Sequence, residues 1–114
     1  MRNASFYYDK GVDYYNEEKY RLAIDEFTTA IRLNPNYTYA YVYRGVAYDK
    51  LSQYQRAIED YDRVIQLVPN FAMAYNNRGW AYQELGKTSS WMTRRKWSSK
   101  AQEDFDKARS LRFE

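Results

Sequence analysis

The stretch "YVYRGVAYDKLSQYQRAIEDYDRVIQLVP", residues 41–69, repeats a pattern that the chain has already used once. It aligns without gaps on "YYDKGVDYYNEEKYRLAIDEFTTAIRLNP", residues 7–35, at an offset of 34 positions. The same offset reaches a third, partial copy, "AYNNRGWAYQELGK", at residues 74–87. A fixed period of this size is typical of stacked supersecondary units, in which each unit packs mainly against its neighbours.

Each copy has the pattern of two short amphipathic helices, because its apolar residues recur at steps of three and four. In residues 41–69 the two stripes contain Tyr41, Gly45 and Tyr48, and then Ala57, Tyr61, Val64 and Leu67. A glycine inside a helix costs about 1 kcal/mol relative to alanine. A glycine at the same register in all three copies therefore indicates that two helices approach each other closely there.

These positions resemble the 34-residue helix-turn-helix motif of the tetratricopeptide repeat family. The first repeat matches it at Tyr7, Gly11, Tyr14, Ala23, Phe27, Ala30 and Pro35, and the second at Tyr41, Gly45, Tyr48, Ala57, Tyr61, Val64 and Pro69. The resemblance implies an all-α fold, a right-handed α-solenoid of three repeats in a single domain spanning residues 1–114. The expected repeats cover about residues 4–37, 38–71 and 72–114.

The third repeat departs from the pattern between its two helices. Its second helix resumes as "KAQEDFDKARSL", residues 100–111, so ten residues are inserted at about 88–97. The inserted residues have three interpretations: an early helix start near Ser89 or Ser90, a partner-binding loop, or a neutral insertion. Phe113 stands where the other repeats have proline, and no capping helix follows. We therefore expect either a fragment of a longer protein or self-association through the uncapped C-terminal helix.

Composition limits the chemistry of the chain. None of its 114 residues is cysteine or histidine, so thiolate nucleophiles, imidazole bases and the commonest zinc ligands are absent. Acid pairs such as Asp60 and Asp62 fall on the predicted solvent-exposed side of a helix. We expect no enzyme, no cofactor and no metal site. No apolar run approaches the roughly 18 residues of a membrane span, so we expect a cytoplasmic protein.

The family resemblance implies that the first helices of successive repeats line a concave groove for a peptide or helix of a partner protein. The implied groove residues are Tyr8, Val12, Tyr39, Val42, Tyr43, Val46, Met73, Asn76, Asn77 and Trp80, with Ser5, Tyr15, Asp49 and Gln83 in the same rows. Tyrosine, valine, methionine and tryptophan favour apolar or aromatic ligands. Alternatively, the tyrosines stack on one another and close the inner surface.

One subgroup of the family holds the C-terminal carboxylates of chaperones with a clamp of lysines, an arginine and asparagines. The equivalent positions here are Tyr8, Val12, Tyr43, Met73 and Asn77. Since only one asparagine of the clamp remains, the resemblance argues against an acidic chaperone tail as the ligand.

The inserted segment is a second candidate site, because it is strongly basic. Five cations, at positions 87, 94, 95, 96 and 100, lie in a chain whose total charge is only +3. The candidate residues combine cations with aromatic rings: Trp91, Arg94, Arg95, Lys96 and Trp97. This combination fits a nucleic acid, an acidic protein surface or an anionic membrane. The main prediction remains a scaffold for protein partners, with nucleic-acid or anionic-surface binding as the alternative.

Overall fold

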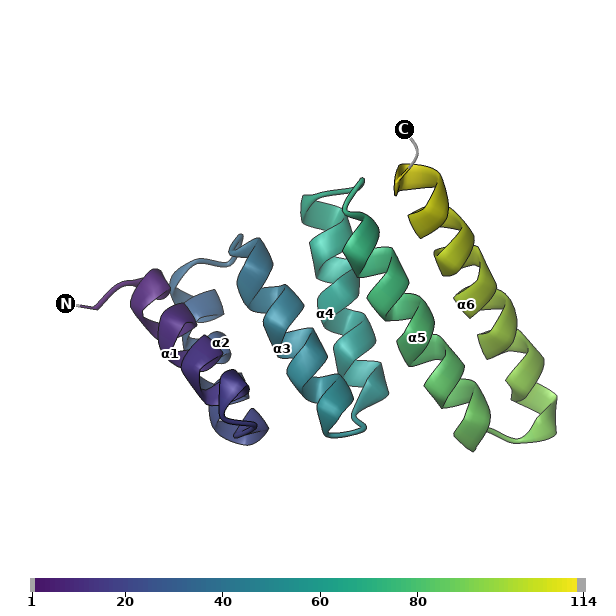
Figure 1. Cartoon of the computed structure of the whole chain (residues 1–114), viewed down its shortest axis with the longest axis horizontal. Helices are drawn as coiled ribbons and strands as arrows, with labels where there is room; N and C mark the ends of the chain where they lie inside the picture. Colours follow the sequence, from purple (N-terminus) through teal and green to yellow (C-terminus); the bar gives the residue numbers. More distant parts are fainter. Residues whose placement is uncertain (1, 113–114) are drawn as a thin grey trace.

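The chain folds into helices that stack side by side as three antiparallel pairs (Figure 1), in a computed structural model that describes residues 2–112. The described helices are α1 (Ala4–Asn16), α2 (Tyr20–Leu33), α3 (Thr38–Lys50), α4 (Tyr54–Leu67), α5 (Ala72–Thr88) and α6 (Trp91–Arg112). The array measures 49 × 33 × 21 Å, and α1, α3 and α5 lie in front of α2 and α4 in Figure 1. The predicted all-α solenoid of helix-turn-helix repeats is confirmed. Phe113, which stands in place of the third proline, lies outside the described residues.

The repeated glycines mark the closest approach between the two helices of each pair. A Cβ atom added to Gly45 would lie 2.7 Å from Cε1 of Tyr61, whose side chain is completely buried. Gly11 and Gly79 face aromatic rings of α2 and α6 in the same way, at 2.5 and 2.7 Å. An aromatic ring of the second helix thus occupies the space that a side chain on the first helix would need.

Small and medium side chains fill the space between successive pairs. One cluster contains Tyr41 and Val42 of α3, Val64 of α4 and Ala74 of α5. Alanines at such contacts let helix backbones approach, so that larger neighbours interdigitate around them. Val42 is only 4% exposed, so its prediction as a groove residue is wrong: it packs inside the solenoid between neighbouring pairs.

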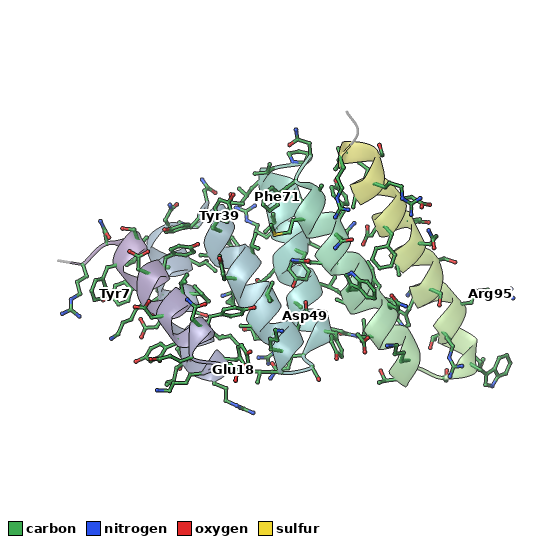
Figure 2. All side chains as sticks on the ribbon, in the orientation of Figure 1. Tyr7, Glu18, Tyr39, Asp49, Phe71 and Arg95 are labelled. Atoms are coloured by element: carbon green, nitrogen blue, oxygen red, sulfur yellow. The ribbon has the colours of Figure 1, made fainter. Side chains whose placement is uncertain are left out.

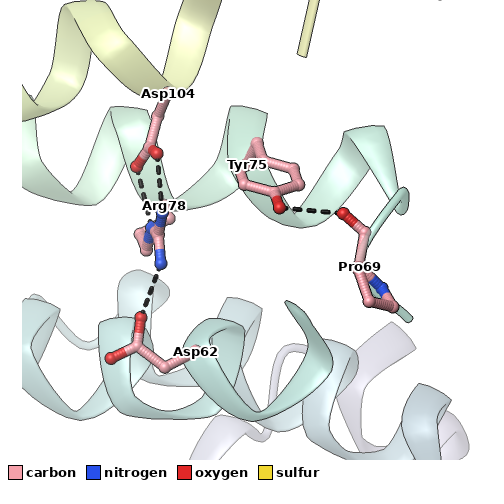
Figure 3. A network of polar contacts seen from close by, with 5 residues as sticks. All are labelled: Asp62, Pro69, Tyr75, Arg78 and Asp104. Atoms are coloured by element: carbon pink, nitrogen blue, oxygen red, sulfur yellow. Dashed lines mark hydrogen bonds and ion pairs between the residues drawn. The ribbon is translucent and has the colours of Figure 1, made fainter. Parts of the chain in front are cut away.

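Two arginines tie the helices together through buried carboxylates. Arg44 donates from Nε and Nη2 to Asp60 at 2.9 and 2.7 Å, and Asp60 is 4% exposed. Arg78 makes the same paired contact with Asp104 of α6 and also donates from Nη1 to Asp62 of α4 at 2.8 Å (Figure 3). The prediction that Asp60 lies on the solvent side is therefore wrong. A buried carboxylate requires such a bidentate partner to compensate for its lost hydration.

Tyrosine hydroxyls form hydrogen bonds to the backbone of the turns between repeats. Tyr41 donates to the carbonyl of Pro35 at 2.9 Å, and Tyr75 donates to that of Pro69 at 2.8 Å, as Figure 3 shows for the second pair. Both prolines follow the end of a second helix, since α2 ends at Leu33 and α4 at Leu67.

The inserted residues lengthen two helices and do not form a long loop. Helices α5 and α6 have 17 and 22 residues, whereas α3 and α4 have 13 and 14. Only Ser89 and Ser90 separate them, so the early helix start is the interpretation that the structure supports. None of the helices within residues 2–112 is both long enough and apolar enough to cross a membrane.

Candidate functional site: a groove between α3 and α5

Three predicted groove residues present large exposed side chains on neighbouring first helices. Tyr39 of α3 is 51% exposed, and Met73 and Trp80 of α5 are 49% and 53% exposed. The Tyr39 ring packs edge-on against Phe71 at 5.9 Å, near one end of the groove, while Asp49 lies near the other end (Figure 2). Exposed side chains of this size on adjacent helices are typical of a surface that binds a partner.

The tyrosines near α1 behave differently, because they pack on each other. Tyr8 stacks on Tyr37 at 4.9 Å and meets Tyr43 edge-on at 5.9 Å, and Tyr15 also contacts Tyr43. Burial, followed by the neighbouring tyrosines, raises the pKa of Tyr8 to about 12. At this end the tyrosines contact one another, which is the first part of the alternative interpretation of the sequence. Val12 of α1 is half-buried.

A pocket of about 320 Å³ opens between α3 and α5. Its walls are Val46, Asp49, Lys50, Tyr54, Tyr61, Asn77, Trp80, Ala81 and Glu84. The family resemblance had implied that Val46, Asn77 and Trp80 are groove residues. It missed Tyr54 and Glu84, because neither lies in a row of first-helix positions that the family resemblance assigns to the groove.

Asn76 and Trp80 also line a second hollow, between α5 and α6. Its volume is about 430 Å³, and its other walls are Gln83, Gln102, Phe105, Ala108, Arg109 and Arg112. Trp80 packs edge-on against Phe105 at 5.2 Å. Trp80 therefore lines both hollows.

Asp49 is the chemically unusual member of the groove. Its Oδ2 accepts a hydrogen bond from the Tyr61 hydroxyl at 2.5 Å, while Oδ1 is buried and has no donor among residues 2–112. Burial, and to a smaller extent Glu84, raise the pKa of Asp49 to about 6 against the opposing effects of the Tyr61 hydrogen bond and Lys50. A buried acceptor without a donor is rare in folded proteins and calls for an explanation.

The residues of the basic candidate site are divided by the fold. Trp91 is 81% exposed at the start of α6, and Arg95 points away from the body of the protein (Figure 2). Arg94 and Lys96 are also exposed. Trp97 instead turns inward and stacks on Tyr82 of α5 at 5.8 Å, with an interplanar angle of 18°. Trp97 is therefore a packing residue of the α5–α6 pair, and Trp91 remains with the cations.

Within residues 2–112, no three acidic side chains are grouped so that they could hold a metal ion. The buried acids Asp60 and Asp104 are each held by an arginine. Recognition through shape, apolar area and charge is what this surface can provide.

Two family models described as tetratricopeptide repeat match the chain, one over residues 8–70 and one over residues 60–90. A search of curated proteins finds no match. Among solved structures, MamA is 32% identical with a TM-score of 0.84, over 96% of this chain and 58% of MamA. The chain therefore spans little more than half of MamA.

Two further similar structures contain chaperone ligands. One is the first TPR domain of Spaghetti (RPAP3), bound to the HSP90 peptide SRMEEVD. It is 26% identical to this chain with a TM-score of 0.83, and the match covers 96% of this chain and 79% of the Spaghetti chain. The TPR2B domain of yeast Sti1, in complex with pHsp70, is 25% identical with a TM-score of 0.81, over 95% and 78%.

Proposed function

Because the chain belongs to the tetratricopeptide repeat family, we propose that it is a protein–protein interaction scaffold that binds a segment of a partner between α3 and α5. The observation that carries the proposal is the row of half-exposed Tyr39, Met73 and Trp80 beside a pocket. A preformed groove on rigid helices loses little conformational entropy when a partner binds. The peptide complexes of the Spaghetti and Sti1 domains support an interaction role.

The chemistry of the groove favours a ligand other than the acidic tail SRMEEVD. At the clamp positions this chain has Tyr8, Val12, Tyr43, Met73 and Asn77, and Tyr8 and Tyr43 are engaged in aromatic packing. No cation occupies any of these five positions. The expected ligand is an extended or helical segment with apolar or aromatic side chains, whose backbone amides and carbonyls pair with Asn76 and Asn77.

The proposal is tested by selecting displayed random dodecapeptides on the immobilised protein and measuring the affinity of the selected peptides. Trp80→Ala is expected to weaken binding at least ~30-fold, because truncation of a central interface tryptophan costs about 2 kcal/mol or more. Trp91→Ala is the matched control, since Trp91 is exposed but lies outside the groove. Selected peptides that bind Trp80→Ala as tightly as wild type would show that the groove is not the binding site.

A second candidate function is binding to an anionic membrane through the α5–α6 turn. Trp91 and Met92 are 81% and 73% exposed beside Arg94 and Arg95, and interfacial tryptophan next to cations is typical of membrane surfaces. Cosedimentation with phosphatidylserine vesicles, and none with phosphatidylcholine vesicles, is the expected result. It should be lost in the Trp91→Ala, Arg95→Ala double variant. Preference for duplex DNA, with an affinity falling steeply with salt, would instead favour the nucleic-acid alternative.

A further inference from the structure

Asp49 has no complete set of hydrogen-bond partners within the fold. The two buried acids of the described chain, Asp60 and Asp104, each receive two hydrogen bonds from one arginine. Asp49 receives one, from the Tyr61 hydroxyl, and its Oδ1 lacks both a donor and solvent. Groups that are destabilising in the free protein are commonly retained where binding uses them. The question is which ligand would compensate for this carboxylate.

The pocket around Asp49 combines negative charge with an apolar and aromatic wall. Glu84 is a second carboxylate in its lining, and Val46, Ala81 and the half-exposed Trp80 are the apolar part. Two cations also face this region. Lys50 lines the pocket. Lys87, whose side chain is 62% exposed, forms an ion pair with Glu84 at 2.8 Å.

The pairing of Lys87 with Glu84 does not neutralise the pocket, because an exposed ion pair contributes at most ~1 kcal/mol and is easily exchanged. Lys50 is exposed at the rim and lowers the pKa of Asp49 only partly, since the pKa of that carboxyl remains raised. The pocket therefore has a carboxylate oxygen without a donor, that of Asp49, and Trp80 in the same lining.

We propose that this pocket receives the cationic side chain of an arginine or lysine from the partner segment, held between the carboxylates of Asp49 and Glu84. The inference rests on the proposed function, and it specifies one residue of the ligand. The aliphatic stem of such a side chain packs on Val46 and Ala81, and the head group contacts the face of Trp80 by a cation–π interaction. The positive charge compensates for the incompletely partnered carboxylate of Asp49.

The proposed ligand has the opposite charge to the chaperone peptide in the similar Spaghetti domain. In this chain none of the five clamp positions carries a cation, and Asp49 and Glu84 add negative charge between α3 and α5. An acidic residue at this place in a ligand would be repelled by both carboxylates. Charge thus selects for a basic residue and against an acidic one.

The direct test titrates the folded full chain with Nα-acetylarginine amide, followed by ¹H–¹⁵N NMR at neutral pH. The neutral isostere Nα-acetylcitrulline amide is the ligand control. We expect saturable shifts of the Trp80 indole N–H and the Asn77 side-chain amide with the arginine compound, and none with citrulline. Equal shifts with both compounds, or no shifts at these two groups, would overturn the inference.

Protein variants then identify the carboxylate. Asp49→Asn keeps the shape of the side chain and an acceptor for Tyr61, so its fold should be unchanged. It should reduce the affinity for the arginine compound about tenfold or more, the loss expected for one hydrogen bond to a charged group. Glu103→Gln removes the same charge from an exposed position on α6 outside the pocket and should leave the affinity unchanged. Equal losses of affinity in the two variants would show that the effect comes from net charge, and the proposed cation pocket would then be wrong.

The selected dodecapeptides separate this inference from the proposed function. If peptides bind through Trp80 but carry no basic residue that depends on Asp49, the groove binds segments and the cationic pocket is wrong. If the arginine compound binds at Asp49 and no peptide is selected, the pocket exists and the proposed scaffold function is wrong.

Discussion

The same substitution at two helical glycines is expected to change stability in opposite directions. Alanine in place of a helical glycine gains up to about 1 kcal/mol of helix propensity. A Cβ atom on Gly86 would lie 3.5 Å from Cβ of Trp97, an ordinary contact, so Gly86→Ala should stabilise the protein by about 0.5–1 kcal/mol. At Gly45 the new atom would lie 2.7 Å from a ring carbon of Tyr61, about 1 Å closer than an optimal carbon–carbon contact.

The Tyr61 ring cannot yield easily, because it is completely buried and its hydroxyl is bonded to Asp49. Overpacking of this kind costs about 1–3 kcal/mol, and the propensity gain offsets part of it. We expect Gly45→Ala to lower the free energy of unfolding by about 1–2 kcal/mol. Urea denaturation of both variants, followed by circular dichroism with unchanged m-values, measures the difference. Stabilisation of both variants by similar amounts would refute the argument that the ring of Tyr61 requires a glycine.

Three further predictions concern single side chains. The pKa of Asp49, about 6, is above its unfolded value near ~3.9, so the free energy of unfolding should fall as pH rises between the two. In acid, the free energy of unfolding of Asp49→Asn should therefore equal that of wild type. At neutral pH it should be about 1–2 kcal/mol higher, after allowance for solvent screening. Urea denaturation across pH measures both. In the same assay, Asp104→Asn should lower the free energy of unfolding by about 2–3 kcal/mol; the loss is limited because Arg78 still pairs with Asp62. Asp106→Asn, whose ion pair with Arg109 is exposed, should change it by less than ~0.5 kcal/mol. Trp97→Ala should cost about 1–2 kcal/mol in thermal unfolding through its lost stack, and Trp91→Ala less than ~0.5.

The helix pairs were predictable because their packing contacts repeat in the sequence. Gly45 and Tyr61 occupy the same register as Gly11 and Phe27, so the pattern reports a contact that each pair makes again. The Arg44–Asp60 contact was not predicted, although Arg78 and Asp104 repeat it. Acids and bases that alternate along one helix are typical of a solvated face. Only the three-dimensional pairing shows that an arginine on the first helix reaches across to the second.

The insertion was ambiguous for a different reason. Its serines and threonines have weak and similar preferences for helix and for loop, so the sequence allowed a loop, a longer helix or a neutral segment. Packing between α5 and α6 favours the longer helix, because Trp97 stacks on Tyr82 of the facing helix. Tertiary contact here overrides local propensity.

Within the groove, periodicity predicted the rows of residues but not their exposure. Tyr39 and Tyr43 belong to the same first helix and are the same residue type, yet Tyr39 is half-exposed and Tyr43 is surrounded by rings from Tyr8 and Tyr15. The difference comes from the neighbours that adjacent repeats supply, and a single helical pattern does not contain it. The pocket likewise needs α3, α4 and α5 together.

The repeats provide an internal comparison that separates scaffold residues from binding residues. Arg44 and Asp60 recur as Arg78 and Asp104, as expected for a contact that holds the second and third pairs together. Asp49 does not recur, since the equivalent positions, 15 and 83, are tyrosine and glutamine. A side chain that occurs once, keeps an acceptor without a donor and lines a groove is not required by the repeating fold. The proposed cationic ligand would give this side chain a role in binding, where the fold gives it none.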